Sequence, residues 1–207
     1  MIPTSSRLTA DPSPTLRARL ARDAVPIAML VACVVAELLG DAGRGWLRYE
    51  RAAVLAGEAW RLLSGSIVHL GPRHLLLNLA ALAALWALAP AAMRGRRGAL
   101  AIGGGALGVG LGLLAFAPAV GWYVGVSGVL HGLLAITARD LLRARDALGI
   151  PLALLLLTKL VWESTAGPLP FTAQAAGGPV IVVAHLYGTL GALLAVVAAE
   201  AFAKRQL

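Results

Sequence analysis

The alternation of apolar and polar stretches along the chain predicts a membrane protein built from helices. Six apolar runs are each bounded by basic, polar or glycine- and proline-rich residues. Residues 1–23 contain four arginines and three prolines and are predicted to be a flexible basic tail on the cytoplasmic side. Residues 24–207 are predicted to form one membrane domain, whose six spans lie at about residues 24–39, 74–93, 99–117, 127–139, 147–163 and 179–203.

Composition supports this class. Hydrophobic residues make up 59% of the 207 residues and charged residues 14%, which is more apolar surface than a soluble domain of this size hides. The net charge of +8 does not indicate a nucleic-acid partner, because the basic residues stand at the ends of the apolar runs. The protein is therefore expected to lie in the lipid bilayer. The single cysteine, Cys33, excludes an intrachain disulfide, and its place within an apolar run argues against a metal or redox role.

The distribution of lysine and arginine predicts the orientation. Four lie in the tail, three between the second and third spans, three between the fourth and fifth, and two at the C-terminus. The opposite connections hold five, none and none, and all five fall in the long first loop, where positive charge counts for less. Both termini are therefore predicted to be cytoplasmic, and the first, third and fifth loops face outward.

This topology brings several polar side chains to one depth. Twelve residues separate Ser127 from Arg139, or roughly 18 Å of helix, so Ser127 starts its helix roughly 10 Å below the outer surface. His185 and Asn78, on spans that enter from outside, reach a similar depth, and His74 lies one turn above Asn78. Polar groups inside a membrane are costly and usually functional.

The residues around this layer resemble a known family. The nucleophile-like segment GVSG at 125–128 and the string AHLYGTLG at 184–191 resemble the motifs of rhomboid intramembrane serine proteases. So do Trp60-Arg61 and the string HLGPRHLLLNL at 69–79. The string SGVLHG and the compact length resemble the rhombosortase branch of that family. The resemblance implies an all-α, rhomboid-like bundle of six transmembrane helices in a bacterial inner membrane, and a serine-type endopeptidase without cofactors or metal.

The resemblance assigns the chemistry residue by residue. Ser127 would attack a peptide carbonyl, and His185 would accept its proton and return it to the leaving amine. No carboxylate is expected at this depth to orient His185, because Glu163 and Asp140 lie near predicted helix ends. The sequence therefore predicts a Ser-His dyad rather than a triad.

Further residues are expected to support this dyad. His74 and Asn78 lie four residues apart on one helical face, so both are predicted to help the Ser127 N–H hold the oxyanion. Gly125 and Gly128 leave room beside the serine, and the faces Gly128/Gly132 and Ala184/Gly188 allow the fourth and sixth spans to pack closely. His131 lies one turn from Ser127 and competes with His185 as the base on geometry. We favour His185 as the base and His131 as the residue that packs against it.

Less specific interpretations remain for several residues. His69 suits an interfacial loop, and His74 with Asn78 suits polar contacts between helices. Lys159 and Glu163 are expected to form a structural i, i+4 pair. Residues 164–178 form either an ordinary loop or a lid over the site.

The resemblance also implies a class of substrate. Rhombosortase-like clients are exported proteins that carry a C-terminal tail with a Gly-rich motif, one hydrophobic helix and a few basic residues. The acyl-enzyme would be hydrolysed or captured by an amine. The alternatives are a general rhomboid protease for other single-span clients, and a rhomboid-like protein that binds clients without cutting them. A transporter or metal site built from the four histidines is disfavoured because no cysteine or carboxylate joins them.

Overall fold

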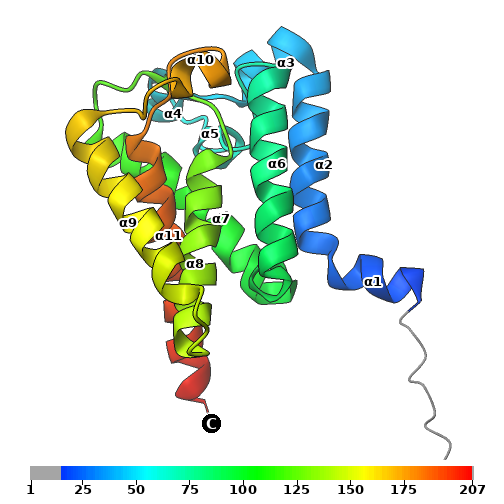
Figure 1. Ribbon diagram of the computed structural model, residues 1–207. Coiled ribbons are helices and arrows are strands. Elements are labelled where there is room, and N and C mark those ends of the chain that lie inside the picture. The colour runs from blue at the N-terminus through cyan, green and yellow to red at the C-terminus, as the bar shows by residue number, and fades with distance from the viewer. Residues whose placement is uncertain (1–14, 207) are drawn as a thin grey trace, which may run out of the picture.

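The computed structural model describes residues 15–206, which form a helical bundle (Figure 1). Among these residues six helices have 15 or more residues, and they fall where the sequence predicts spans. They are α2 (Ala24–Leu38), α6 (Pro72–Leu88), α7 (Gly95–Phe116), α8 (Ser127–Arg143), α9 (Gly149–Ala166) and α11 (Val183–Lys204). A 3₁₀ turn, η1 (Pro90–Met93), joins α6 to α7. The protein is an all-α membrane bundle.

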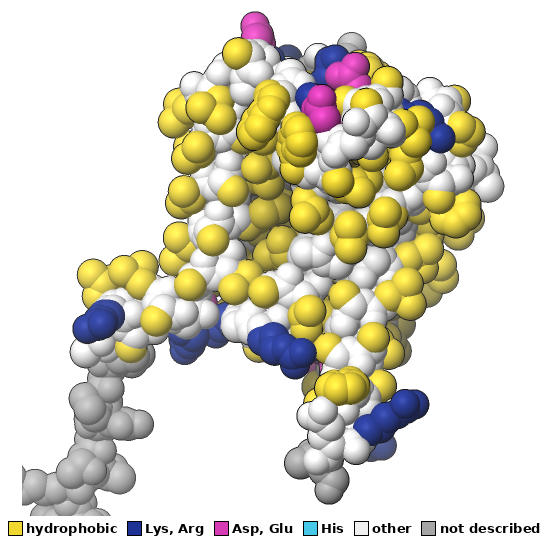
Figure 2. Space-filling view, turned by 180° about the vertical axis from the view of Figure 1, so that it is seen from behind, with side chains coloured by type: hydrophobic (Ala, Val, Ile, Leu, Met, Phe, Trp, Pro, Cys, Tyr) yellow, Lys and Arg dark blue, Asp and Glu magenta, His cyan; other side chains and the backbone are white. Residues whose placement is uncertain are grey.

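The outer surface of the bundle is suited to lipid. Helices α7, α9 and α11 are long and apolar enough to cross a membrane, and α2 and α6 are shorter apolar helices. On α9, Leu154, Leu155 and Leu157 each expose more than half of their surface. Figure 2 shows apolar side chains around the middle of the molecule, lysine and arginine side chains at its lower end, and charged side chains of both signs at its upper end. The number of spans in the bilayer, six, stays a prediction.

Part of the predicted tail is helical. Residues 1–14 lie outside the described residues, but Leu16–Arg22 forms α1, with the side-chain oxygen of Thr15 accepting a hydrogen bond from the Ala18 N–H. The capping threonine and the run of good helix formers explain this helix. In Figure 1, α1 and the C-terminal end of α11 lie at the same end of the bundle, as predicted for termini on one side.

The long first loop is folded and holds the segment before Ser127. It contains α3 (Gly40–Leu47), α4 (Arg51–Leu55), α5 (Arg61–Ser64) and a two-residue strand, β1 (Tyr49–Glu50). This strand pairs antiparallel with β2 (Trp122–Tyr123), and the Gly125 N–H donates to the Gly65 carbonyl oxygen at 3.0 Å. The first loop and the segment that leads into α8 are thus one structural unit.

Close packing of α8 against α11 depends on small residues, as predicted. A Cβ added at Gly128 would lie 2.7 Å from the Ala184 carbonyl oxygen, and one added at Gly132 would lie 2.7 Å from the Gly188 carbonyl oxygen. A Cβ added at Gly188 would lie only 2.1 Å from the Gly128 carbonyl oxygen. Backbone therefore meets backbone along this interface, and the first turns of the two helices lie side by side.

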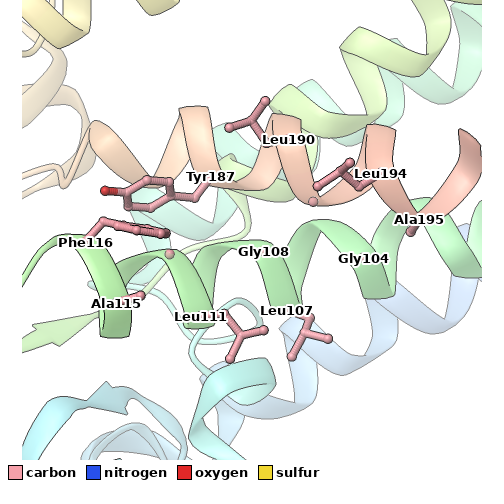
Figure 3. Close-up of a pocket in the computed structure, with 12 residues that line it drawn as sticks. Gly104, Leu107, Gly108, Leu111, Ala115, Phe116, Tyr187, Leu190, Leu194 and Ala195 are labelled. Atoms are coloured by element: carbon pink, nitrogen blue, oxygen red, sulfur yellow. The ribbon is translucent and has the colours of Figure 1, made fainter. Parts of the chain in front are cut away.

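Small residues on α7 also allow it to pack closely against α11. A Cβ at Gly108 would lie 2.6 Å from the Tyr187 carbonyl oxygen. On the outer side of this contact lies an apolar groove of about 420 Å³, with Tyr187 and Phe116 at one end (Figure 3). None of the predicted site residues lines this groove.

Candidate active site

The serine and histidine predicted as a pair are in hydrogen-bonding contact. Ser127 is the first residue of α8, and His185 lies in the first turn of α11. The His185 Nε2 lies 3.0 Å from the Ser127 Oγ. His185 exposes only 3% of its surface, so the contact is shielded. This geometry allows the imidazole to accept the hydroxyl proton when its Nε2 is unprotonated.

A carboxylate also contacts His185, so the expectation that no carboxylate reaches this depth is wrong. The Glu163 Oε2 lies 2.7 Å from the His185 Nδ1, and the other carboxylate oxygen accepts a hydrogen bond from Lys159. The reason is the length of α9, which continues to Ala166 instead of ending at Glu163. Glu163 is thus inside the helix, about one turn before its C-terminal end, where its side chain reaches His185.

His131 lies against one face of the His185 ring. The two rings are stacked, with centroids 4.0 Å apart and planes 11° apart. The His131 Nδ1 lies 2.7 Å from the Ser127 carbonyl oxygen, an acceptor, so this nitrogen carries the proton. Because the His131 Nδ1 bonds the backbone of Ser127 and not its Oγ, the structure favours His185 over His131 as the group that faces the hydroxyl.

His74 and Asn78 are on α6 and line one cavity together with Ser127. The Leu70 N–H donates to the His74 Nδ1 at 3.3 Å, which leaves the proton on Nε2. A Cβ added at Gly125 would lie 2.9 Å from the His74 Cε1, and the Gly125 φ of +126° is strained for other residues. The Asn78 side-chain amide donates one N–H to the His74 carbonyl oxygen, at 3.0 Å, and its second N–H remains available as a donor. Two side-chain donors therefore stand beside the serine.

His69 is buried rather than interfacial. It is fully inaccessible and packs edge-on against His74, with ring centroids 5.1 Å apart. Burial lowers the pKa of His69 to about 3, so its ring is uncharged at neutral pH. An uncharged His69 ring packs against His74 without placing a positive charge beside it.

A cavity of about 200 Å³ opens at the serine. It is lined from four sides, by α6, α8, α9 and the start of α11, and includes Asn78, Ser127, Lys159 and His185. The short helix α10 (Thr172–Ala176) covers it, with Thr172, Ala175 and Ala176 in the lining. The sequence did not decide whether residues 164–178 form an ordinary loop or a lid. The structure shows that they contain a segment placed over the site.

The geometry of the two stacked histidines does not suit a shared metal ion. Among the described residues, His131, Glu163 and His185 have candidate ligand atoms within 4.8 Å of one another. An imidazole binds an ion in the plane of its ring, where the nitrogen lone pair lies. The planes of the two rings are nearly parallel and about one ring thickness apart, so they do not meet at a common ion. The expectation of a site without metal stays a prediction, and this geometry favours it.

Comparison with protein families adds the decisive observation. Residues 56–200 match the Rhomboid domain family, and this match covers well over half of the chain. The chain belongs to the rhomboid family. Rhomboids are intramembrane serine proteases that act on membrane-protein substrates. A search of curated proteins gave no match to this rhomboid.

Two structural features around the site of this rhomboid were not predicted from its sequence. The pairing of β1 with β2 leaves no signal, because each strand has only two residues. Glu163 did leave one, since a glutamate with a lysine four residues before it stands in an otherwise apolar helix. Its depth, counted from Ala166 at the predicted outer end of α9, is close to that of His185 counted in the same way on α11.

Proposed function

We propose that this rhomboid is a serine endopeptidase in which Ser127 is the nucleophile and His185 the general base. The observation that carries the proposal is the 3.0 Å contact between the Ser127 Oγ and the His185 Nε2. As the Oγ–carbon bond forms, the hydroxyl proton passes to Nε2. When the peptide C–N bond breaks, the same proton passes to the leaving amine, and the acyl group stays on Ser127 until water or an amine removes it.

Hydrogen-bond donors on two helices support the proposal. The developing oxyanion would be held by the Ser127 N–H, which is unpaired within α8 because it opens the helix. The His74 Nε2–H and the second N–H of the Asn78 amide are further donors on residues that line the same cavity. Donors fixed by other contacts need no rearrangement when charge develops, which is the main source of oxyanion stabilisation.

The rhombosortase-like string SGVLHG supports a narrower proposal for the substrate. The clients would be exported proteins with a C-terminal tail that has a Gly-rich motif, a hydrophobic helix and basic residues. A serine about 10 Å below the outer surface reaches a bond only at the outer end of a spanning helix. Glycines there unwind the helix and expose its carbonyl groups, and the basic residues keep the other end of the helix inside.

The proposed substrate predicts a dependence on glycine. A client with such a tail, co-expressed with the protein, should be shortened at the Gly-rich motif, and the product mass measured by mass spectrometry should lack the hydrophobic helix. Replacing the client's glycines by leucine should block processing, because leucine favours a continuous helix. Co-expression with Ser127→Ala is the matched control and should leave the client intact.

The result separates the candidate functions. If the leucine client is cut as well as the glycine client, the protein is a general rhomboid protease and the rhombosortase-like substrate is wrong. If the client is bound but stays intact, the protein is a rhomboid-like client-binding protein. The contact between Ser127 and His185 favours cleavage over binding alone.

We also propose that the termini lie in the cytoplasm of a bacterium, with the protein in the inner membrane. The basic residues near the ends of α6, α8 and α11 support this orientation. Reporter domains fused after residues 95 and 207 should both be cytoplasmic, and a reporter fused after residue 167 should be periplasmic. A periplasmic signal at residue 95 or 207 would contradict the orientation and the depth of Ser127 derived from it.

A further inference from the structure

The carboxylate of Glu163 joins two other side chains in the wall of the site. It exposes 5% of its surface, and each of its oxygens has its own partner: Oε2 contacts the His185 Nδ1 at 2.7 Å, and Oε1 accepts from Lys159. A carboxylate oxygen can only accept a hydrogen bond, so the His185 Nδ1 must be the donor in this contact. The proton of a neutral His185 then lies on Nδ1, and Nε2 is left free to accept from Ser127.

We propose that Glu163 is a positioning residue that sets the tautomer of His185, so that the site is a Ser127–His185–Glu163 triad. The inference rests on the proposed serine protease function. When His185 takes the serine proton, both nitrogens of its ring carry hydrogen. The negative charge of Glu163 then stabilises the imidazolium, and the Nδ1 proton stays on His185. His131, stacked on the ring at 4.0 Å, fixes the ring plane, and Glu163 fixes its rotation within that plane.

Lys159 allows a direct test of the role of Glu163. An ammonium group is a donor with no acceptor, so it orients any group placed at residue 163. In Glu163→Gln, which keeps the size and shape of the side chain, the amide oxygen would turn toward Lys159 and the amide N–H toward His185. The Nδ1 would then have to accept, and the proton would move to Nε2. That nitrogen could no longer take the proton of Ser127.

A second substitution should reverse the defect. In Glu163→Gln combined with Lys159→Met, no donor holds the amide oxygen away from His185. The amide can flip and accept from the Nδ1–H, which restores the productive tautomer. A residue that served only to hold α9 in place would behave differently, because removing the second partner of the pair would weaken the structure further.

The experiment measures labelling of Ser127 by a fluorophosphonate probe in the full-length protein in detergent micelles. Glu163→Gln should lower the maximal labelling rate by about 100-fold and leave the half-saturating probe concentration unchanged, because the serine is less activated while the cavity is intact. The double variant should recover at least about tenfold of that loss. Asp41→Asn, which neutralises a carboxylate in a solvent-exposed pair with Arg44 on α3, is the matched control and should label at the wild-type rate.

Each outcome decides the matter. Labelling of Glu163→Gln at the wild-type rate would overturn the triad, and so would a double variant no faster than Glu163→Gln. If wild type is not labelled, or Ser127→Ala is labelled equally, the proposed protease function fails instead. Wild-type labelling that depends on Ser127, together with unaltered labelling of Glu163→Gln, would leave the protease function standing with a dyad.

Discussion

Replacing Ser127 or His185 by alanine is expected to lower the rate of client cleavage by about 10⁶-fold, because nucleophile and base act as one unit. Ser127→Ala removes the oxygen that attacks the carbonyl, and His185→Ala removes the nitrogen 3.0 Å from that oxygen. The double variant should be no slower than either single variant. Cleavage of a single-span client in proteoliposomes, followed by mass spectrometry, measures the effect, and fluorophosphonate labelling gives an independent reading of the serine.

His131→Ala is the informative comparison for this prediction. His131 stacks on His185 and bonds the Ser127 carbonyl oxygen, so its removal should loosen the base without removing it. Cleavage should therefore fall but remain detectable. If His131→Ala abolished cleavage and His185→Ala left a remainder, the base would be His131 and the assignment of His185 would be wrong.

Gly188→Ala is expected to reduce both activity and stability, although it adds a single methyl group. The added Cβ would lie 2.1 Å from the carbonyl oxygen of Gly128 and 2.9 Å from its Cα, so α8 and α11 must move apart. Overpacking of this kind costs about 1–3 kcal/mol in the free energy of unfolding. Because Ser127 and His185 lie within one turn of the contact, a separation of about 1 Å should also lower cleavage by 100-fold or more.

The control for this prediction is Gly103→Ala, the same change on another membrane helix. A Cβ at Gly103 on α7 would meet nothing within 4 Å, and alanine favours helix more than glycine does. The apparent Tm in detergent should rise or stay level for Gly103→Ala and fall for Gly188→Ala, with cleavage unaffected in the former. Equal behaviour of the two variants would mean that close approach of α8 and α11 is not required.

The proposed substrate and the proposed topology both depend on the depth of Ser127 below the outer surface, so a test of one is also a test of the other. A client cut at its Gly-rich motif on the outer side requires Ser127 to lie near the outer surface. That position in turn requires the cytoplasmic orientation of the basic helix ends. If the reporters placed residue 95 outside, the proposed client tail would be presented to the wrong side of the membrane.

The sequence by itself determined the class of the protein and much of the bundle. Long apolar runs bounded by basic residues must form helices in lipid, because unpaired backbone groups there are too costly. The predicted spans therefore agree with the long helices to within a few residues. The glycine faces were also predictable, since a small residue every four positions places a bare stripe on one side of a helix. Ser127 and His185 could be placed at one depth because both lie near the predicted outer ends of such helices, and the resemblance to rhomboids chose them as the pair.

Only the tertiary structure decided which groups complete the site. The contact of Glu163 with His185 depends on how far α9 continues and on how closely it lies beside α11, and neither is encoded in local periodicity. The two-residue pairing of β1 with β2 and the burial of His69 depend on how the first loop folds back onto the segment before α8. These contacts join residues that are distant in the chain. Their geometry is set by packing, whereas the positions of the helices are set by the cost of placing backbone in lipid.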